Sequence, residues 1–541
     1  MFESLVNAAL ASRGVAAVGA WAHVENAACA RRLFASADEL ERMLAADGSD
    51  NRDQWCLDNW GAVAASIAAA QNVSLGVASH QLLVADSLRR YLPRVAEVFA
   101  AGAINYRMVA AIVNRTRLIK DPDALAKVDT EIGARVQDWA SLSVDKIEHE
   151  IDHWIDRYDP AAVRRTEYSA RGCHVDIHKP EDGSGTASLE AQLLATDADA
   201  LDQQLDAIAR TVCEGDPRTL DQRRSAALGA LGQKAERLVC GCENPDCDAK
   251  GAVSSAVVVH VVAHEESLTD DTPAQLDGKD PPLFDKPLSE VTWGDALTPD
   301  PPPTNGPART RPAALLSGGI LPAPLLAAKV AGTAKIVPIR HPGDAPPEPR
   351  YIPSVVLATF IRCRDMTCRF PGCDEPAYGC DIDHTIAYPH GPTQASNLKI
   401  LCRKHHLLKT FWGWQDQQHP DGTVTWTCPQ GQKYTTHPGS RLLFPTLCHP
   451  TAPAEVVRPS DATTDPAARG LAMPRRQTTR AQNRTKAIDE ERRFNQTLIQ
   501  AEAEQRARER EREQSQDPGT DWGSAHFPSR PPPSYDDPPP F

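Results

Sequence analysis

The sequence predicts a multidomain protein whose N-terminal part is mainly α-helical and whose C-terminal part holds a small unit rich in cysteine and histidine. The first observation is length, because 541 residues are enough for two or three domains with proper cores. The second is the proline content, since 45 prolines are too many for one compact fold. They cluster, which predicts ordered domains separated by disordered connections. The third is periodicity, which is helical early in the chain and strand-like in places further on.

Residues 1–265 are expected to form a mainly helical domain with one small β-hairpin. From Ser79 to Thr116 apolar residues recur at three- and four-residue spacing, and a helix that begins near Ser143 should end at Pro160. From Cys173 to Ala195 the period falls to two around an Asp-Gly-Ser-Gly turn, which is typical of a hairpin. No catalytic or binding motif is recognisable in this part of the sequence, so we assign no activity to the region.

Three further segments follow the helical region. Residues 266–350 have the composition of a proline-rich linker, and one apolar stretch in it, from Leu315 to Ile339, is expected to dock back onto a domain. Residues 351–450 form the next compact unit. Residues 451–541 are predicted to be a tail that is partly disordered, with a charged helix from Arg475 to Glu513. That helix lacks the apolar positions of a coiled coil, so we expect it to be solvated or disordered.

The charge and the cysteine distribution limit the function classes. A net charge of −14 means that nucleic acid could be drawn only to a local basic patch, not to the whole molecule. The N-terminus has no basic region before an apolar core, and no run of about 18 uncharged apolar residues occurs, so neither a signal peptide nor a membrane span is expected. We therefore expect a cytoplasmic protein. Most of its 14 cysteines fall in two short clusters, which indicates metal binding rather than disulfides.

The second of these clusters has the spacing of a structural zinc site. A Cys-x4-Cys pair is followed about thirty residues later by a Cys-x-x-His pair, and two such pairs suit a tetrahedral ion. On a helix the second pair, at i and i+3, points to one side. The predicted ligands are Cys368, Cys373, Cys402 and His405. Cys363 and Cys380 stand close enough in the sequence to be substitute ligands, and buried cysteines without metal are the simpler alternative.

Between and after these pairs the sequence reads strand, loop, strand, helix. Asp383-His384 lies at a short strand, Asn397 opens a second strand, and "CRKHHLLKT" begins a helix. From Cys368 to Thr410 the chain thus resembles the HNH endonucleases, in which a zinc-stapled ββα-metal core carries Asp-His, Asn and His in this order. The whole layout also resembles actinobacterial repeat-element proteins that join a helical domain of unknown function to an HNH nuclease domain.

The chemistry of phosphodiester hydrolysis assigns roles to these residues. His384 is the expected general base, because an imidazole titrates near neutral pH. The resemblance implies that Asp383 and His406 hold one catalytic Mg²⁺ or Mn²⁺, and that Asn397 fixes the orientation of His384. Neighbouring His405 and His406 lie about 100° apart around a helix, so one can face the zinc and the other the catalytic ion. Because Cys402 and His406 also share a face at i and i+4, the two histidines could exchange roles.

Basic residues around this core could neutralise DNA phosphates despite the acidic total. For each of them a purely solvated face is the competing interpretation. The candidates are Arg362, Arg364, Arg369, Lys399, Arg403, Lys404 and Lys409.

The first cysteine cluster is less regular. Cys240, Cys242 and Cys247 could bind a second zinc with a fourth ligand from the following strand, His260 or His264, but the irregular spacing favours no metal here.

The sequence therefore predicts a metal-dependent HNH endonuclease that hydrolyses DNA, with DNA as partner and without a membrane. The alternative is a non-catalytic DNA-binding or mobile-element accessory protein that uses the same zinc-stapled unit. No feature of the sequence predicts the DNA site, the oligomeric state, or whether one strand or both are cut.

Overall fold

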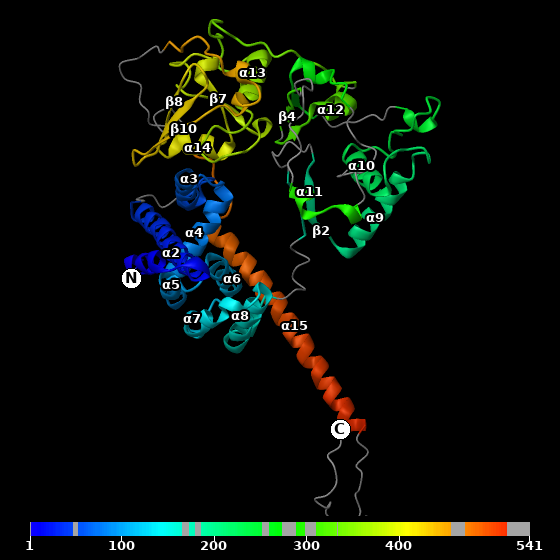
Figure 1. The fold of residues 1–541 in the computed structure, drawn as a ribbon. Helices are drawn as coiled ribbons and strands as arrows, with labels where there is room; N and C mark the ends of the chain where they lie inside the picture. Colours follow the sequence, from blue (N-terminus) through cyan, green and yellow to red (C-terminus); the bar gives the residue numbers. More distant parts are fainter. Residues whose placement is uncertain are drawn as a thin grey trace, which may run out of the picture.

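The computed structural model shows a mainly helical protein with four small sheets in its described part (Figure 1). The described residues are 2–46, 52–164, 173–178, 186–251, 259–272, 288–297, 310–316, 318–332, 334–455 and 471–516. The predicted Asp-Gly-Ser-Gly turn lies outside these ranges, as do residues 273–287 and 298–309 of the proline-rich linker.

Eight helices form an N-terminal bundle. They begin where short polar residues cap the first turn: the side chains of Asp58, Ser74, Asn105 and Ser143 each accept a hydrogen bond from a backbone N–H of the helix that follows. One apolar core, which includes Phe99 in the bundle interior, joins most of these helices. The helices are α1 (Phe2–Ala11), α2 (Gly14–Ala46), α3 (Asn59–Gln71), α4 (Leu75–Arg90), α5 (Pro93–Ala100), α6 (Tyr106–Thr116), α7 (Pro122–Arg135) and α8 (Val144–Tyr158).

A second, smaller unit follows the bundle. Strands β1 (His174–His178) and β2 (Ser188–Gln192) pair antiparallel, which confirms the predicted hairpin strands. Helices α9 (Ala195–Ala209) and α10 (Leu220–Gly232) then pack on each other around a separate apolar core. The region predicted as one domain thus contains at least two separate packed units, the bundle and the α9–α10 unit.

The predicted linker contains ordered structure. Strand β4 (Ala313–Leu315) lies between β3 (Val261–Val262) and β5 (Ile320–Leu321), and helix α12 (Ala323–Leu326) follows. Ala314 and Leu316 are buried in the core of the C-terminal unit, so the prediction that the apolar stretch docks onto a domain is confirmed. A short helix, α11 (Trp293–Leu297), lies between β3 and β4 in the chain.

The C-terminal unit has the predicted strand, loop, strand, helix order. Helix α13 (Val355–Asp365) precedes the antiparallel pair β6 (Asp381–His384) and β7 (Leu398–Leu401), and α14 (Arg403–Phe411) follows directly. A three-stranded antiparallel sheet, of order β10-β9-β8, completes the core; its strands are β8 (Gln415–Gln418), β9 (Val424–Thr427) and β10 (Lys433–Thr436).

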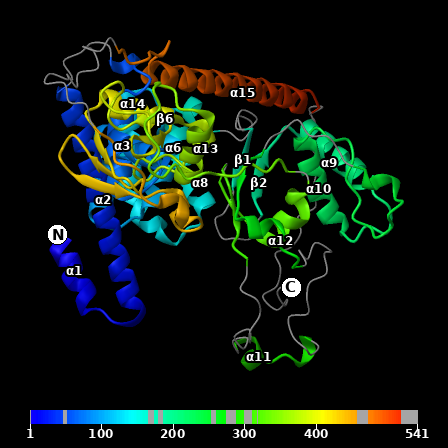
Figure 2. The same ribbon diagram turned by 90° about the horizontal axis from the view of Figure 1, so that it is seen from above.

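The charged tail helix α15 (Arg480–Gln516) is not the freely solvated helix predicted. Its first half packs on the N-terminal bundle, where Asn495 is fully buried and Arg492 forms an ion pair with Asp159 at 2.6 Å. Its second half extends beyond the bundle (Figures 1 and 2). These contacts use polar groups, which explains why the sequence shows no apolar stripe.

Among the described residues no single helix is long and apolar enough to cross a membrane. The bent pair of α3 and α4 passes such a test together by length and composition. Buried residues of α3 belong to the core of the C-terminal unit, those of α4 belong to the core of the bundle, and both helices share a third apolar cluster.

Candidate metal and nuclease site

The candidate site lies where β6, β7 and the start of α14 meet. In the antiparallel register Asp383 stands opposite Lys399, and His384 stands opposite Leu398. Cys402 is the N-cap residue of α14, so the helix begins at the edge of the strand pair. This arrangement brings residues from both strands and the first helical turns to one place.

The four predicted zinc ligands come together. Their ligand atoms lie within 4.8 Å of one another, and His405 Nδ1 is 3.2 Å from the sulfur of Cys402 and 3.5 Å from that of Cys368. A sulfur and a nitrogen bound to one tetrahedral zinc lie about 3.5 Å apart, given Zn–S and Zn–N bonds of about 2.3 and 2.0 Å. The cluster, completed by Cys373, can therefore hold a metal such as zinc. Cys363 and Cys380 are not in it.

The surroundings of this cluster are dry and aromatic. The His405 ring is 3% exposed and stacks on Phe370 at 4.0 Å between centroids. The backbone N–H of Cys402 donates to the sulfur of Cys368 at 3.3 Å, which is the kind of contact that stabilises a thiolate.

The two neighbouring histidines of α14 point in different directions. His405 faces the cysteines, whereas His406 Nε2 lies 3.4 Å from Asp383 Oδ1. The other ring nitrogen of His406, Nδ1, lies 2.9 Å from Asp381 Oδ2. The carboxylate of Asp381 thus favours the tautomer with the proton on Nδ1, so the lone pair of Nε2 faces Asp383, as a shared cation would require.

A buried ion cluster surrounds Asp383. Its Oδ2 accepts hydrogen bonds from Lys399 and Lys409, each at 2.7 Å, and both lysines also pair with Asp416. Burial alone would raise the pKa of Asp383, but the two ammonium groups and His406 hold it well below its usual range. Asp383 is therefore ionised at neutral pH, with Oδ1 directed toward His406.

His384 lies next to this cluster in a pocket of aromatic and polar groups. Its Nε2 is 2.9 Å from the hydroxyl of buried Thr393, and its ring stacks on Tyr351 at 5.2 Å. Burial lowers the pKa of His384, so the imidazole is neutral at pH 7. A neutral ring is the form that can accept a proton.

Asn397 connects the two ends of the loop between β6 and β7. Its Oδ1 accepts from the backbone N–H of Ile386, and its Nδ2 donates to the carbonyls of Ile386 and Pro392. Gly391 packs so closely here that an added Cβ would lie 2.6 Å from Asn397 Nδ2. Asn397 fixes the loop that contains Thr393, so it acts on His384 indirectly.

The predicted basic surface is only partly correct. Lys399 is fully buried in the ion cluster, and Arg364 and Arg369 are each 2% exposed and pair with buried Asp365. These three side chains were predicted as phosphate contacts, but burial removes them from the surface. Arg403 and Lys404 are exposed on α14, while Arg362 and Lys409 are partly buried.

The cluster at Cys240, Cys242 and Cys247 differs from the prediction in its fourth member. Cys213, from the end of the α9 segment, completes a group whose sulfur atoms lie within 4.8 Å of one another, so this cluster too can hold a metal such as zinc. The predicted fourth ligands are wrong, because His260 stacks on Tyr378 and His264 Nε2 bonds the carbonyl of Leu443.

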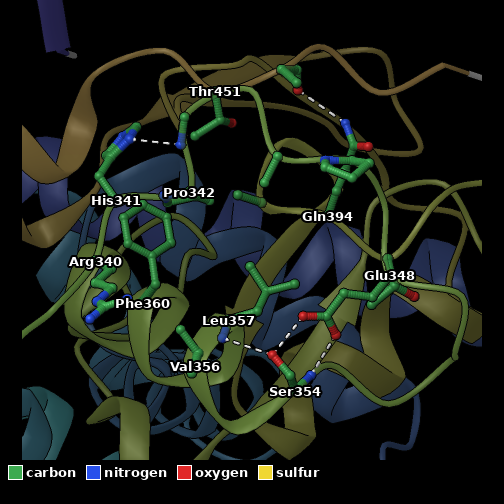
Figure 3. Close-up of a pocket in the computed structure, with 16 residues that line it drawn as sticks. Arg340, His341, Pro342, Glu348, Ser354, Val356, Leu357, Phe360, Gln394 and Thr451 are labelled. Carbon is green, nitrogen blue, oxygen red and sulfur yellow. Dashed lines mark hydrogen bonds between the residues drawn. The ribbon is translucent and has the colours of Figure 1, made fainter.

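Behind the loop between β6 and β7 lies a cavity of about 190 Å³, lined in part by Thr393 and Phe360 (Figure 3). Glu348 closes one side by accepting hydrogen bonds from the backbone N–H and hydroxyl of Ser354, both at 2.6 Å. The cavity is mostly apolar, and it shares with the site only the chain segment around Thr393.

Comparison with known proteins identifies the family. The model of a domain of unknown function, DUF222, matches residues 21–291, half of the chain. The chain belongs to the DUF222 family. It is 49% identical over 492 residues to the uncharacterized protein Rv2100 of Mycobacterium tuberculosis, across 90% of this chain and 88% of that protein. The uncharacterized protein Rv3776 of the same organism is 48% identical over 483 residues, across 88% of this chain and 89% of its own. No solved structure matches this DUF222 protein.

Helices α3 to α8, most of α2, the α9–α10 unit and β3 fall within the DUF222 match, whereas α1 and the ββα site lie outside it. Sequence reasoning missed three side chains of this site, namely Asp381, Thr393 and Asp416. Asp381 could have been predicted as a neighbour of Asp383, because it lies two residues earlier and so on the same face of β6.

Proposed function

We propose that this DUF222 protein is a metal-dependent HNH-type endonuclease that hydrolyses phosphodiester bonds in DNA. The observation that carries the proposal is the pairing of Asp383 Oδ1 with His406 Nε2 at 3.4 Å, directly beside the neutral His384. The pairing stands on a strand, loop, strand, helix unit with a four-residue Cys/His cluster.

The donors fit one divalent cation. Mg²⁺ or Mn²⁺ bound by Asp383 and His406 would neutralise charge on the scissile phosphate and on the leaving oxygen. Asp381 orients His406 for this role. The three carboxylates of Asp381, Asp383 and Asp416 are balanced by Lys399, Lys409 and Arg403, so a dication leaves the site with a net positive charge for a phosphodiester.

The remaining residues supply the proton chemistry and the positioning. His384 accepts the proton of the attacking water, and Thr393 holds the edge of its ring. Asn397 keeps the loop that contains Thr393 in place. In the same proposal the Cys/His cluster binds zinc that fastens the loop before β6 to the start of α14, and exposed Arg403 and Lys404 contact DNA phosphates.

A specific observation favours the alternative, a non-catalytic DNA-binding protein. Lys399 and Lys409 already neutralise one oxygen of Asp383, and such an ion cluster can serve stability alone. The two functions differ in what they require of His384, because a binding module has no need for a neutral imidazole at this position.

A cleavage assay distinguishes them. Full-length protein is incubated with supercoiled plasmid and Mg²⁺ or Mn²⁺, with and without chelator. We expect metal-dependent nicking or linearisation that His384→Ala reduces by at least about 100-fold, in line with the loss of a general base. His149→Ala, on an exposed face of α8, is the matched control and should cleave like the wild type. Equal inactivity of all three proteins across metals and DNA forms, together with retained DNA binding, would support the alternative.

A further inference from the structure

The four cysteines of the α9–α10 unit have the geometry of a metal ligand set. The sulfur atoms of Cys213 and Cys240 lie 3.5 Å apart, and those of Cys242 and Cys247 complete the group. A disulfide needs about 2.05 Å, and all four cysteines are free thiols. Four sulfurs bound to one tetrahedral zinc lie about 3.8 Å apart, given Zn–S bonds of about 2.3 Å.

The unit around this cluster has a small apolar core. Among its described residues the buried members of that core are Ile208, Val212, Ala227 and Leu238, together with Cys240 and Cys242 themselves. A core of this size supplies little stability, and small units commonly depend on a metal or disulfides. The cysteines come from both sides of α10, so an ion at the cluster would join α9 to the chain that follows α10.

The backbone around the Cys-x-Cys turn is held in place for such a site. The carboxylate of Asp216 accepts a hydrogen bond from the N–H of Gly241 at 2.8 Å and pairs with Arg218 at 2.7 Å. The N–H of Cys240 donates to the carbonyl of Ala249 at 2.9 Å. These contacts fix the turn independently of any metal.

We propose that Cys213, Cys240, Cys242 and Cys247 bind a structural zinc ion as four thiolates. Zinc is the soft-ligand, redox-inert cation that such a closed tetrahedral set selects. The ion stabilises the α9–α10 unit, so the protein carries two structural zinc ions, one in each of its cysteine clusters.

Metal analysis of the purified full-length protein tests this directly. We expect two zinc ions per chain in the wild type, one in Cys213→Ser, and two in the control Cys173→Ser, which changes an exposed cysteine outside both clusters. Cys368→Ser removes the other ion, so failure of one site is distinguishable from failure of the other.

If Cys213→Ser does not fold, the four-cysteine site can be tested in Cys368→Ser instead. Cobalt bound there should show the absorption bands of a tetrahedral thiolate complex. An unchanged zinc content in Cys213→Ser, bound iron, or disulfides in place of titratable thiols would each overturn the proposal.

A second, independent feature is a cationic cavity of about 440 Å³ between α4, the chain after α6 and the tail helix α15. Four arginines line it, with Glu491 as the carboxylate among the lining residues; they are Arg117, Arg164, Arg480 and Arg484. Residues more than 300 positions apart in the sequence thus build one cavity.

The positive charge in this cavity is incompletely neutralised. Arg480 pairs with Asp58, and Arg164 lies 3.6 Å from Glu491. Within the described part of the chain, the side chains of Arg117 and Arg484 make no hydrogen bond or ion pair, and the buried Nε of Arg117 has no partner. Burial, and then the charges of Arg484 and Arg164, lower the pKa of Arg117, and the opposing effect of Glu491 does not cancel them.

We infer that this cavity binds a small phosphorylated molecule. Unpaired guanidinium groups suit a phosphate, which they can bond in bidentate fashion. The volume is in the range of ligand sites, and the ring of Trp60, which also lines the cavity, lies under the Arg480 guanidinium at 5.7 Å and helps to hold it there. The ligand would contact both the bundle and α15, so its binding fastens the tail helix to the bundle.

Calorimetry of the full-length protein with inorganic phosphate and with adenosine monophosphate tests this site. We expect saturable binding that Arg484→Gln weakens at least tenfold and that Arg493→Gln, on the exposed face of the same helix, leaves unchanged. The ligand should also slow amide exchange in the first half of α15. Absence of saturable binding, equal binding by both variants, or binding of a DNA duplex alone would overturn the proposal.

Discussion

Lys399→Met tests whether this lysine serves the fold or DNA contact. Its ammonium group lies 2.7 Å from Asp383 and 2.5 Å from Asp416, with no exposed surface. Removal of one partner from a buried ion pair costs about 3–5 kcal/mol, because the other charge stays buried. Lys409 still contacts both carboxylates in the variant, so we expect the lower end, about 3 kcal/mol. Methionine keeps most of the apolar stem, so lost packing adds little.

Amide hydrogen exchange of β6 and β7, measured by mass spectrometry, is the assay. A loss of about 3 kcal/mol should speed exchange of these strands roughly 100-fold, since each 1.4 kcal/mol is a factor of ten. Lys404→Met makes the same change on the exposed face of α14, where we expect less than about 0.5 kcal/mol.

Adding Asp416→Asn to Lys399→Met should recover part of the protection, because it removes the carboxylate left in excess. If amides of β6 and β7 were equally protected in Lys399→Met and Lys404→Met, the buried ion cluster would not stabilise these strands. A loss of DNA affinity in Lys399→Met without a loss of protection would instead restore the surface role that the sequence suggested.

Further predictions concern DNA contact, the tail, the loop and the metal. Lys404→Met should reduce the slope of log affinity for DNA against log salt by about 1, measured by fluorescence anisotropy. Asp58→Asn keeps a capping side chain but loses the charge that holds Arg480, so α15 should become more sensitive to proteolysis. Burial alone would raise the pKa of Asp58, but the tail arginines hold it below its usual value. The contact of Asp58 with the tail therefore stabilises the protein fully above about pH 3.8, and this stabilisation is lost as the pH falls through the lower folded pKa. Proteolysis of α15 measured across this pH range would show the loss. Gly391→Ala should abolish cleavage yet retain zinc, because its Cβ would lie 2.2 Å from the Ile386 carbonyl oxygen. Cys368→Ser should lose zinc, by metal analysis, and leave the C-terminal unit poorly folded.

The C-terminal unit could be predicted from sequence because its information is local. Asp383, Asn397 and Cys402 lie within twenty residues, and strand and helix periods place them relative to one another. The roles of His405 and His406 could not be decided in this way. Both share a helical face with Cys402, and the tertiary positions of Cys368 and Asp381 show which ring faces which group.

The burial of Lys399 and the role of Cys213 could not be predicted from the sequence. All four residues of β7 are buried, so the usual alternation of exposed and buried positions does not apply and Lys399 carries no sign of its burial. Cys213 lies 27 residues before Cys240, with α10 between them, and only the packing of α9 on α10 brings the two together.

The contacts between the halves of the molecule bear on how the proposed nuclease would meet DNA. Trp412, just after α14, donates from its indole to the carbonyl of Leu57, and its ring meets Trp55 edge to face. Gly372, in the loop of the Cys/His cluster, has a φ of +71° and would bring a Cβ within 2.8 Å of the Val73 carbonyl oxygen. The two contacts lie at either end of α3, and three alanines of this helix belong to the core of the C-terminal unit. The site is therefore packed on the N-terminal bundle rather than tethered to it, and any DNA that reaches His384 must do so in an orientation that the bundle permits.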